Sequence, residues 1–348
     1  MIGLVDFSPR ACPRQTRLVS GFFMDTTIKI DSIKGKFIGK DIISLDQFSP
    51  SDIAILFKHT KKMKAIAKNA RPSNILRGNL VTLIFYEPSS RTFGSFGAAI
   101  KQLGGGTIDI LDPQHFSSVS KGETLEDTIR VFEAYCDAIV IRHPIIGTAA
   151  RAAEIAKFIP ILNAGDGNGE HPTQALLDLY TIYERFKRLD NLTAVMAGDP
   201  FNSRTIHSLI RGLSLYKKNT VYLLSPKELR LSRNDFTNFL KRGVKLIEIF
   251  NEKDMPKNAD LWYWTRVQKE RFKDEKAYNK VKDSFYLTTP LVKKYAGKNT
   301  ILMDPLPRVG KIDMRVDDDP RALYLRTQIR NGMYIRMALI ALVLGKIK

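Results

Sequence analysis

A polar run of Ser89, Ser90, Arg91 and Thr92 follows the apolar stretch 79–86 and precedes a segment with helical spacing of apolar residues. A strand-to-helix junction presents free backbone N–H groups and the positive end of the helix dipole, so an anion is stabilised there. The hydroxyl groups can donate hydrogen bonds to phosphate oxygens, and the guanidinium of Arg91 can bind a phosphate through two parallel bonds. The run therefore predicts a phosphate site, although alone it fits a plain serine N-cap beside a surface arginine slightly better.

Further polar residues follow two later strands of the same series. Arg142 comes directly after the apolar run 138–141, while His171 and Gln174 end a glycine-rich segment that follows the run 159–162. Ligands gather at the carboxyl edge of a parallel sheet, so these side chains and the predicted phosphate site are expected to converge. A lone histidine beside a proline is more often a capping or packing residue, but polar residues at three strand ends favour a shared site.

Apolar runs alternate with helix-type segments along most of the chain, which is typical of parallel sheets with right-handed crossovers. Strands are predicted over 79–86, 107–111, 138–141, 159–162, 192–196, 221–224, 244–249, 261–264 and 300–303. The predicted fold class is α/β, with two lobes that are each a mainly parallel sheet flanked by helices. A long helix from Pro172 is expected to join the lobes, and an amphipathic C-terminal helix over 325–344 is expected to pack back on the first lobe.

The predicted domain boundaries follow from this alternation. They are an N-terminal, flexible extension over 1–36, a first domain over 37–171 completed by 325–348, and a second domain over 172–324. The extension contains Arg10, Arg14 and Arg17 but no long apolar region, so a secretory signal is not expected. Met24 is an alternative start, and a transit-type segment is the weaker alternative.

The composition of the 348 residues, 44% hydrophobic and 26% charged, is that of an ordinary globular protein. The 55 basic and 36 acidic residues give a net charge of +19, which favours an anionic partner. A dedicated nucleic-acid function is disfavoured because Lys and Arg are spread along the chain without an arginine-rich arm or an aromatic platform. A membrane protein is not expected, because the sequence has no apolar run of about 18 to 20 residues.

Cysteine and histidine usage narrows the class further. Cys12 and Cys136 are the only cysteines, which excludes a disulfide framework and a cysteine-based zinc site and favours the cytoplasm. The five histidines have neither HxxxH nor Cys/His spacing, so no metal is expected.

Several separate motifs occur in order along the chain. They are EPSSRT at Glu87–Thr92, SSVSKGETLEDT at Ser117–Thr128, RHP from Arg142, NAGDG and HPTQALLDLYT from Asn163, GDPFNSRTIHSL from Gly198, TRVQKER from Thr265 and DPLPRV from Asp304. Through them the chain resembles the catalytic chain of the aspartate carbamoyltransferase family from about residue 38 onward. The resemblance implies that the amine of L-aspartate attacks carbamoyl phosphate, giving N-carbamoyl-L-aspartate and phosphate for pyrimidine (UMP) synthesis without a cofactor, metal or covalent intermediate.

The resemblance also implies roles for the polar residues at the strand ends. Thr92, Arg142 and His171 polarise the carbonyl group where negative charge develops in the transition state, and Gln174 orients the carbamoyl amide. The departing phosphate accepts a proton from the amine. The residues implied to contact carbamoyl phosphate are Ser89, Ser90, Arg91, Thr92, Ser118, Lys121, Arg142, His171, Gln174 and Leu306, with Arg91, Thr92, Lys121, Arg142 and His171 as the catalytic set.

The second substrate distinguishes members of the family. Arg204 and Arg266 can each bind one carboxylate of aspartate. The residues implied to contact aspartate are Lys121, Arg204, Arg266, Gln268, Leu306 and Pro307. Ornithine is the weaker alternative, because it would need an acidic partner and a His-Cys-Leu-Pro motif, and the corresponding loop begins Asp304-Pro305-Leu306-Pro307. A non-catalytic anion- or RNA-binding relative is the other alternative, motivated by the charge of +19.

Ser118 and Lys121 lie on a polar segment that resembles the loop which family members insert into the site of a neighbouring subunit. The resemblance therefore implies a homotrimer with shared active sites, in which both residues act in trans. In some members a separate regulatory chain also binds, and nothing in this sequence identifies a surface for it.

Some positions depart from the family pattern. Ser90 and Phe93 replace a threonine and an arginine, which are changes that the site tolerates. Asp304 stands where a histidine is usual, and Gly310 and Lys311 replace an acidic pair. The Asp304 carboxylate is expected to weaken aspartate binding through repulsion between like charges.

Overall fold

The computed structural model describes residues 30–69, 73–269, 272, 274–282 and 284–348. The predictions for Arg10, Cys12, Arg14, Arg17 and Met24 lie outside these residues. Ile33, inside the predicted N-terminal extension, is fully buried in the core, and its backbone N–H donates to the carbonyl oxygen of Gln47. The packed part of the first lobe therefore begins before residue 37.

The first lobe contains a four-stranded, wholly parallel sheet in the order β2-β1-β3-β4. The strands are β1 (Leu80–Phe85), β2 (Gly106–Leu111), β3 (Ala138–His143) and β4 (Ile161–Asp166). Its helices include α2 (Ser90–Gln102), α3 (Pro113–Phe116), α4 (Leu125–Glu133) and α5 (Thr148–Ile155). Nearly every residue of β1, β3 and β4 is buried, as expected for continuous apolar runs in a sheet covered on both faces.

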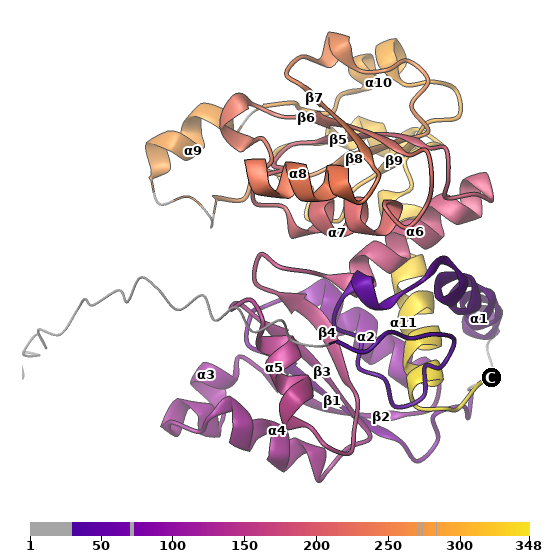
Figure 1. The fold of residues 1–348 in the computed structure, drawn as a ribbon, viewed down its shortest axis with the longest axis vertical. Helices are drawn as coiled ribbons and strands as arrows, with labels where there is room; N and C mark the ends of the chain where they lie inside the picture. Colours follow the sequence, from indigo (N-terminus) through magenta and orange to yellow (C-terminus); the bar gives the residue numbers. More distant parts are fainter. Residues whose placement is uncertain (1–29, 70–72, 270–271, 273, 283) are drawn as a thin grey trace, which may run out of the picture.

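The second lobe contains a five-stranded parallel sheet in the order β7-β6-β5-β8-β9. The strands are β5 (Thr193–Ala197), β6 (Thr220–Leu224), β7 (Lys245–Ile249), β8 (Leu261–Trp264) and β9 (Ile301–Met303). The helices are α7 (Arg204–Leu213), α8 (Arg233–Lys241), α9 (Glu275–Val281) and α10 (Thr289–Tyr295). Each strand predicted from the sequence is present, with some ends displaced, and the two-lobed α/β fold is confirmed (Figure 1).

Helix α6 (Pro172–Phe186) lies where the two lobes meet and coincides with the long helix predicted from Pro172 (Figure 1). It contacts α7 of the second lobe and the C-terminal helix α11 (Ile329–Val343). Because α6 is buried over most of its length, its polar side chains are held between two packed surfaces.

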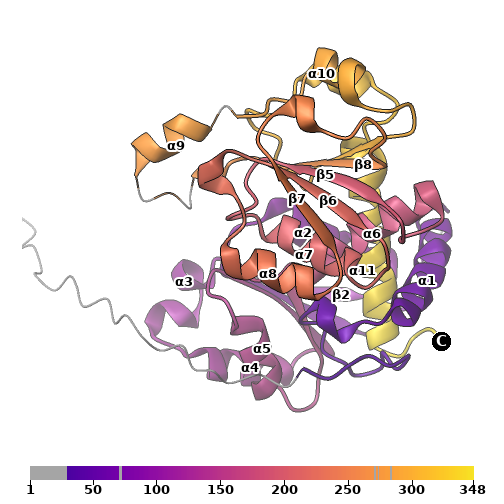
Figure 2. The ribbon, with the colours of Figure 1, turned by 45° about the horizontal axis from the view of Figure 1, so that its top comes forward.

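Helix α11 packs on the first lobe, as predicted, against α1 (Pro50–Lys68), α2 and α6 (Figures 1 and 2). A π-helical turn, η7 (Tyr324–Gln328), precedes it. The expectation of an amphipathic helix is wrong, because helices cover it on several sides and nearly every residue from Asn331 to Val343 is buried.

Helix α1 was not predicted from the sequence, although its start carries a clear signal. Ser49 caps the helix and forms a reciprocal capping box with Asp52, and Pro50 occupies the first turn. Within the described ranges, no helix is long and apolar enough to cross a membrane.

Candidate active site

Two adjoining cavities, of about 380 Å³ and about 450 Å³, lie between the lobes. The residues common to both are Ser89, Arg91, Arg142, Arg204, Thr205, Pro305 and Leu306. The first cavity is also lined by Thr92, Ser95, His171, Gln174, Asp304, Gln328 and Arg336, and the second by Glu87, Ser90, Thr265, Arg266, Gln268, Pro307 and Lys311. The cavities are therefore two ends of one cleft, and most of the polar residues selected from the sequence meet there.

The N-terminus of α2 faces this cleft. Ser89 is the N-cap residue, but its side chain forms no hydrogen bond with the amides of the described first turn. The plain serine-cap alternative is therefore wrong, and the hydroxyl is available for a ligand. Ser90 and Arg91 are exposed, whereas the side chain of Thr92 is buried. Burial lowers the pKa of Arg91 and the nearby Arg266 lowers it further, while Asp304 opposes the shift.

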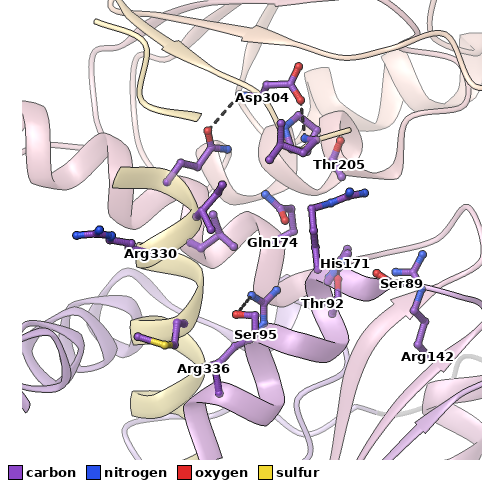
Figure 3. Close-up of a pocket in the computed structure, with 18 of the residues that line it drawn as sticks. Ser89, Thr92, Ser95, Arg142, His171, Gln174, Thr205, Asp304, Arg330 and Arg336 are labelled. Carbon is purple, nitrogen blue, oxygen red and sulfur yellow. Dashed lines mark hydrogen bonds between the residues drawn. The ribbon is translucent and has the colours of Figure 1, made fainter. Parts of the chain in front are cut away.

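His171 projects into the first cavity beside Thr92 (Figure 3). The imidazole is buried, its Nε2 lies 3.4 Å from the Thr92 hydroxyl, and its Nδ1 has no hydrogen-bond partner among the described residues. Although His171 is the N-cap residue of α6, its side chain makes no capping bond there, so the capping alternative is wrong. Burial, reinforced by Arg204, Arg142 and Arg336, places the pKa of His171 well below its usual value. The ring is therefore neutral and can donate one N–H to a carbonyl oxygen.

Gln174 is oriented by a buried carboxylate. Its Nε2 donates to both oxygens of Asp178, at 3.1 and 3.2 Å, which leaves the amide oxygen to accept a bond from a ligand N–H. Asp178 also accepts hydrogen bonds from the Tyr263 hydroxyl at 2.9 Å and from Gln328 Nε2 at 2.7 Å. Burial raises the pKa of Asp178 to about 7. The second lobe and the turn before α11 thus fix the orientation of Gln174.

Arg142 lies inside β3, not beyond it as predicted, and is buried. Its Nη1 donates to the carbonyl oxygen of Ala164, and its Nη2 lies 2.9 Å from the Glu87 carboxylate. Arg204, the first residue of α7, contacts the same carboxylate at 3.5 Å. Gly165 leaves room for the guanidinium of Arg142, because a Cβ at position 165 would lie 2.5 Å from Arg142 Nη1. Glu87 therefore joins arginines from both lobes.

Arg266 and Gln268 follow β8 and line the second cavity together with Arg204. The backbone N–H of Gln268 donates to the buried Asp199 carboxylate at 3.2 Å, and Gln268 Nε2 donates to the carbonyl oxygen of Asn202. The loops that follow β5 and β8 are held together in this way, and the guanidinium groups of Arg204 and Arg266 join those of Arg91 and Arg142 in lining one pocket. Such a pocket suits a ligand with more than one carboxylate.

The repulsion expected from Asp304 is opposed by a neighbouring cation. Asp304 is almost fully buried, and the ammonium group of Lys311 lies 3.0 Å from its Oδ2. The backbone N–H of Leu306 donates to its other oxygen, Oδ1. Two departures from the family pattern therefore compensate each other as an ion pair, so the carboxylate does not stand in the wall of the cleft as an isolated charge.

Ser118 and Lys121 are not brought to this cleft. They form the two ends of the short helix η2 (Ser118–Lys121), are exposed, and line neither cavity. If they contribute to catalysis, they do so in another copy of the chain.

Sequence reasoning missed Glu87, Ser95 and Arg336, which line the cleft, and Asp178, which lies behind Gln174; Lys311 was noted only as a departure from the family pattern. Arg336 is buried, donates to the hydroxyl groups of Ser95 and Thr173, and stacks over the ring of Phe96 at 5.0 Å. An arginine within the apolar run from Met333 to Val343 was a usable signal. Among the described residues, no group of His, Cys, Asp and Glu side chains could hold a metal ion.

Comparison with known proteins agrees with this two-ended cleft. Residues 40–184 match the carbamoyl-phosphate-binding domain of aspartate/ornithine carbamoyltransferases, and residues 190–343 match the Asp/Orn-binding domain. The chain belongs to the aspartate/ornithine carbamoyltransferase family.

Its relatives include proteins named as aspartate carbamoyltransferases. The chain is 42% identical over 301 residues to the aspartate carbamoyltransferase catalytic subunit of Methanocaldococcus jannaschii, an alignment that covers 86% of this chain and 96% of that subunit. It is 43% identical to a multifunctional protein of Dictyostelium discoideum, covering 88% of this chain but only 14% of that protein. A Trypanosoma cruzi aspartate transcarbamoylase, solved with carbamoyl phosphate and aspartate, superimposes with a TM-score of 0.82 at 36% identity over 91% of this chain and all of that one.

Proposed function

We propose that the chain transfers the carbamoyl group of carbamoyl phosphate to the amine of L-aspartate, giving N-carbamoyl-L-aspartate and phosphate in pyrimidine biosynthesis. One observation carries the proposal: the first cavity combines a helix N-terminus with a buried neutral histidine, and it opens into a second cavity lined by Arg204 and Arg266. The first arrangement suits a phosphate and a carbonyl group, and the second suits a dicarboxylate.

In the first cavity, Ser89, Ser90 and Arg91 hold the phosphate at the N-terminus of α2. Thr92, Arg142 and His171 stabilise the carbonyl oxygen as negative charge develops during attack. Because His171 is neutral before the reaction starts, its N–H acts as a hydrogen-bond donor rather than as a source of a proton. Gln174 accepts a hydrogen bond from the carbamoyl N–H, since its own amide nitrogen is bound by Asp178.

In the second cavity, Arg204 and Arg266 bind the two carboxylates of aspartate, with Gln268, Leu306 and Pro307 around the backbone of the amino acid. Holding both substrates with the amine beside the carbonyl supplies much of the rate enhancement. The amine transfers a proton to the departing phosphate. A basic acceptor such as ornithine fits less well, because the Asp304 carboxylate is already paired with Lys311.

A paired assay tests the acceptor. The purified protein is supplied with carbamoyl phosphate and either L-aspartate or L-ornithine, without added metal, and both ureido products are measured. Turnover with aspartate and inhibition by N-(phosphonacetyl)-L-aspartate are expected. Turnover with ornithine alone would refute the proposed acceptor.

We also propose that the active form is a homotrimer in which Ser118 and Lys121 complete the site of a neighbouring chain. Support comes from their exposure on η2, while neither residue lines a cavity of its own chain. A mixture of Lys121→Ala and Arg91→Ala chains tests this arrangement. Each inactive variant should regain activity after the chains are dissociated and reassembled together, because some sites then contain both native residues; no recovery in mixed trimers would contradict sharing.

The cytoplasm is the proposed location. The Cys136 thiol is free and partly buried, which fits a reducing compartment, and fractionation of the native cells with an antibody to the chain is the direct measurement.

A further inference from the structure

A buried ion pair stands behind the turn that separates the two cavities. Asp304 lines the first cavity, Lys311 lines the second, and Pro305 and Leu306 line both. Only 1% of Asp304 and 5% of Lys311 are exposed, so the pair is shielded from solvent. Its two charges therefore act on the cleft without the screening that water provides.

The pair holds the turn through several contacts. Asp304 Oδ1 accepts a hydrogen bond from the backbone N–H of Leu306, and the backbone N–H of Asp304 donates to Gln328 Oε1 at 3.1 Å (Figure 3). Lys311 Nζ also donates to the carbonyl oxygen of Trp264 at 3.4 Å. Leu306 has a φ of +58°, a backbone conformation that residues other than glycine seldom adopt unless their surroundings impose it. The carboxylate is one part of those surroundings.

The charge of the pair matters for anionic ligands. An Asp304 carboxylate without Lys311 would place a net negative charge beside a pocket that binds a dicarboxylate. With Lys311 protonated the pair is neutral, and the charge of the pocket is set by its other ionised residues, namely Arg91, Arg142, Arg204 and Arg266 against Glu87. A buried ion pair seldom adds stability compared with apolar residues of similar volume, so a role in setting the local charge is a better reason for its presence.

We propose that Lys311 is a positioning residue for the acceptor: it neutralises Asp304 and holds the turn 305–307 so that the second cavity accepts a dicarboxylate amino acid. The inference rests on the proposed function and concerns acceptor affinity. It distinguishes Lys311 from Arg204 and Arg266, which touch the acceptor directly in the proposed complex.

Two isosteric single substitutions separate charge from structure. Burial raises the pKa of Asp304 and Lys311 opposes that rise, so Lys311→Met is assayed at alkaline pH, where the Asp304 carboxyl remains ionised. There the variant has an uncompensated carboxylate and should raise the KM for aspartate roughly tenfold or more, exceeding the rise in KM for carbamoyl phosphate. Asp304→Asn leaves an uncompensated ammonium group and should leave the aspartate KM unchanged or lower it. If both variants raise the aspartate KM equally, the pair has only a structural role and the proposal fails.

The double variant Asp304→Asn/Lys311→Met provides the matched control. It removes both charges and should recover most of the aspartate affinity lost in Lys311→Met; a double variant as weak as the single one overturns the proposal. If Lys311→Met does not fold, Asp304→Asn and the charge-preserving Lys311→Arg still test whether the charge of the pair sets the aspartate affinity. Both are expected to keep the aspartate KM within about threefold of the wild type, and a tenfold rise in Asp304→Asn refutes the role of charge.

The pH profile offers a second readout. Burial lowers the pKa of Lys311 to about 8, with Arg266 acting in the same direction and Asp304 opposing it. The aspartate KM of the wild type should therefore rise as the pH passes about 8, and this rise should be absent from the double variant. The charged groups that face the pair are Arg91, Arg266 and Arg308. Asp304 helps to raise the pKa of Asp178 to about 7, so in the double variant the titration of Asp178 moves to lower pH, away from the window near 8. Identical profiles would contradict the proposal.

The two levels of the hypothesis fail in different ways. A wild-type protein that makes no carbamoyl-aspartate refutes the proposed function. A wild-type protein that turns over, beside a Lys311→Met variant with unchanged aspartate KM, refutes only the role of Lys311.

Discussion

The two ends of the cleft are built by different means. The first cavity rests on regular structure: the N-termini of α2 and α6 and the carboxyl end of β3 supply most of its polar groups. The second cavity rests on loops after β5, β8 and β9, which side-chain bonds such as Asp199 to Gln268 and Asp304 to Lys311 hold together. A phosphate can be bound by backbone and hydroxyl donors at a helix terminus, whereas two carboxylates of one amino acid require cations brought from separate loops.

The electrostatics differ as well. In the first cavity a neutral imidazole is maintained by burial and by three surrounding arginines. In the second cavity the cations are partly balanced by carboxylates, with Glu87 shared between Arg142 and Arg204. The carbonyl oxygen of an incoming carbamoyl phosphate competes with Glu87 for Arg142, so binding in the first cavity is expected to change the partners of Arg204 in the second.

The largest predicted effect is a loss of activity without a loss of stability, at Arg91 in the first turn of α2. Arg91→Ala should reduce kcat/KM by roughly 10³-fold, because it removes the guanidinium that stabilises the phosphate and the developing charge. Steady-state kinetics measure the loss, and thermal unfolding should show an unchanged midpoint. Arg130→Ala, on the exposed surface of α4, is the matched control and should retain activity. Wild-type turnover in Arg91→Ala would show that the phosphate binds elsewhere.

His171→Gln should lower kcat by roughly 10²-fold with a smaller change in either KM, because the neutral N–H acts on the transition state. The pKa of His171 lies well below its usual value, so its protonation should not limit activity near neutral pH. On the acid side of neutral, loss of activity through His171 should begin only at a pH low enough to protonate the ring. A profile with a steep loss near the ordinary histidine pKa, abolished in His171→Gln, would show instead that the ring titrates normally.

Arg266→Lys tests the second cavity in isolation. Lysine keeps the charge but loses the fork that binds a carboxylate through two bonds, so the KM for aspartate should rise roughly tenfold while that for carbamoyl phosphate changes little. Arg188→Lys, a pair with Asp260 away from the cleft, provides the control. An equal rise in both KM values would mean that the two ends of the cleft are not separable.

The smallest expected effect concerns stability at the junction of the lobes. Burial raises the folded-state pKa of Asp178 from 3.8 to about 7, so its stabilising contribution is complete below the lower value and is lost as the pH rises through the higher one. The difference in unfolding midpoint between the wild type and Asp178→Asn should therefore shrink by several degrees between about pH 4 and about pH 8. Calorimetry at fixed protein concentration measures it, and a constant difference would mean that Asp178 is ionised throughout.

Prediction from the sequence succeeded where the signal is local. The buried strands were recognisable as apolar runs, and Ser89–Thr92, Arg142 and His171 were found because each follows such a run. Glu87 lies within the EPSSRT motif but was not predicted as a site residue, because its ion pairs are with two arginines from other parts of the chain. In the sequence, Asp178 is one polar residue in a predicted helix. Its role in orienting Gln174 depends on the fold, which brings Gln174, Tyr263 and Gln328 within hydrogen-bond distance of its carboxylate.

The sequence by itself determined the α/β class, the family and the residues proposed to bind a phosphate, because strand burial, helix starts and motif order depend on neighbouring residues. Only the tertiary structure decided which side chains share a pocket and in what state of charge. Asp304 shows the difference most clearly: on its own it predicts repulsion, and a lysine seven positions along the chain removes that charge once folding buries the two together. The reason is physical, since the energy of a buried charge is set by its partners and its solvent access, and folding fixes both.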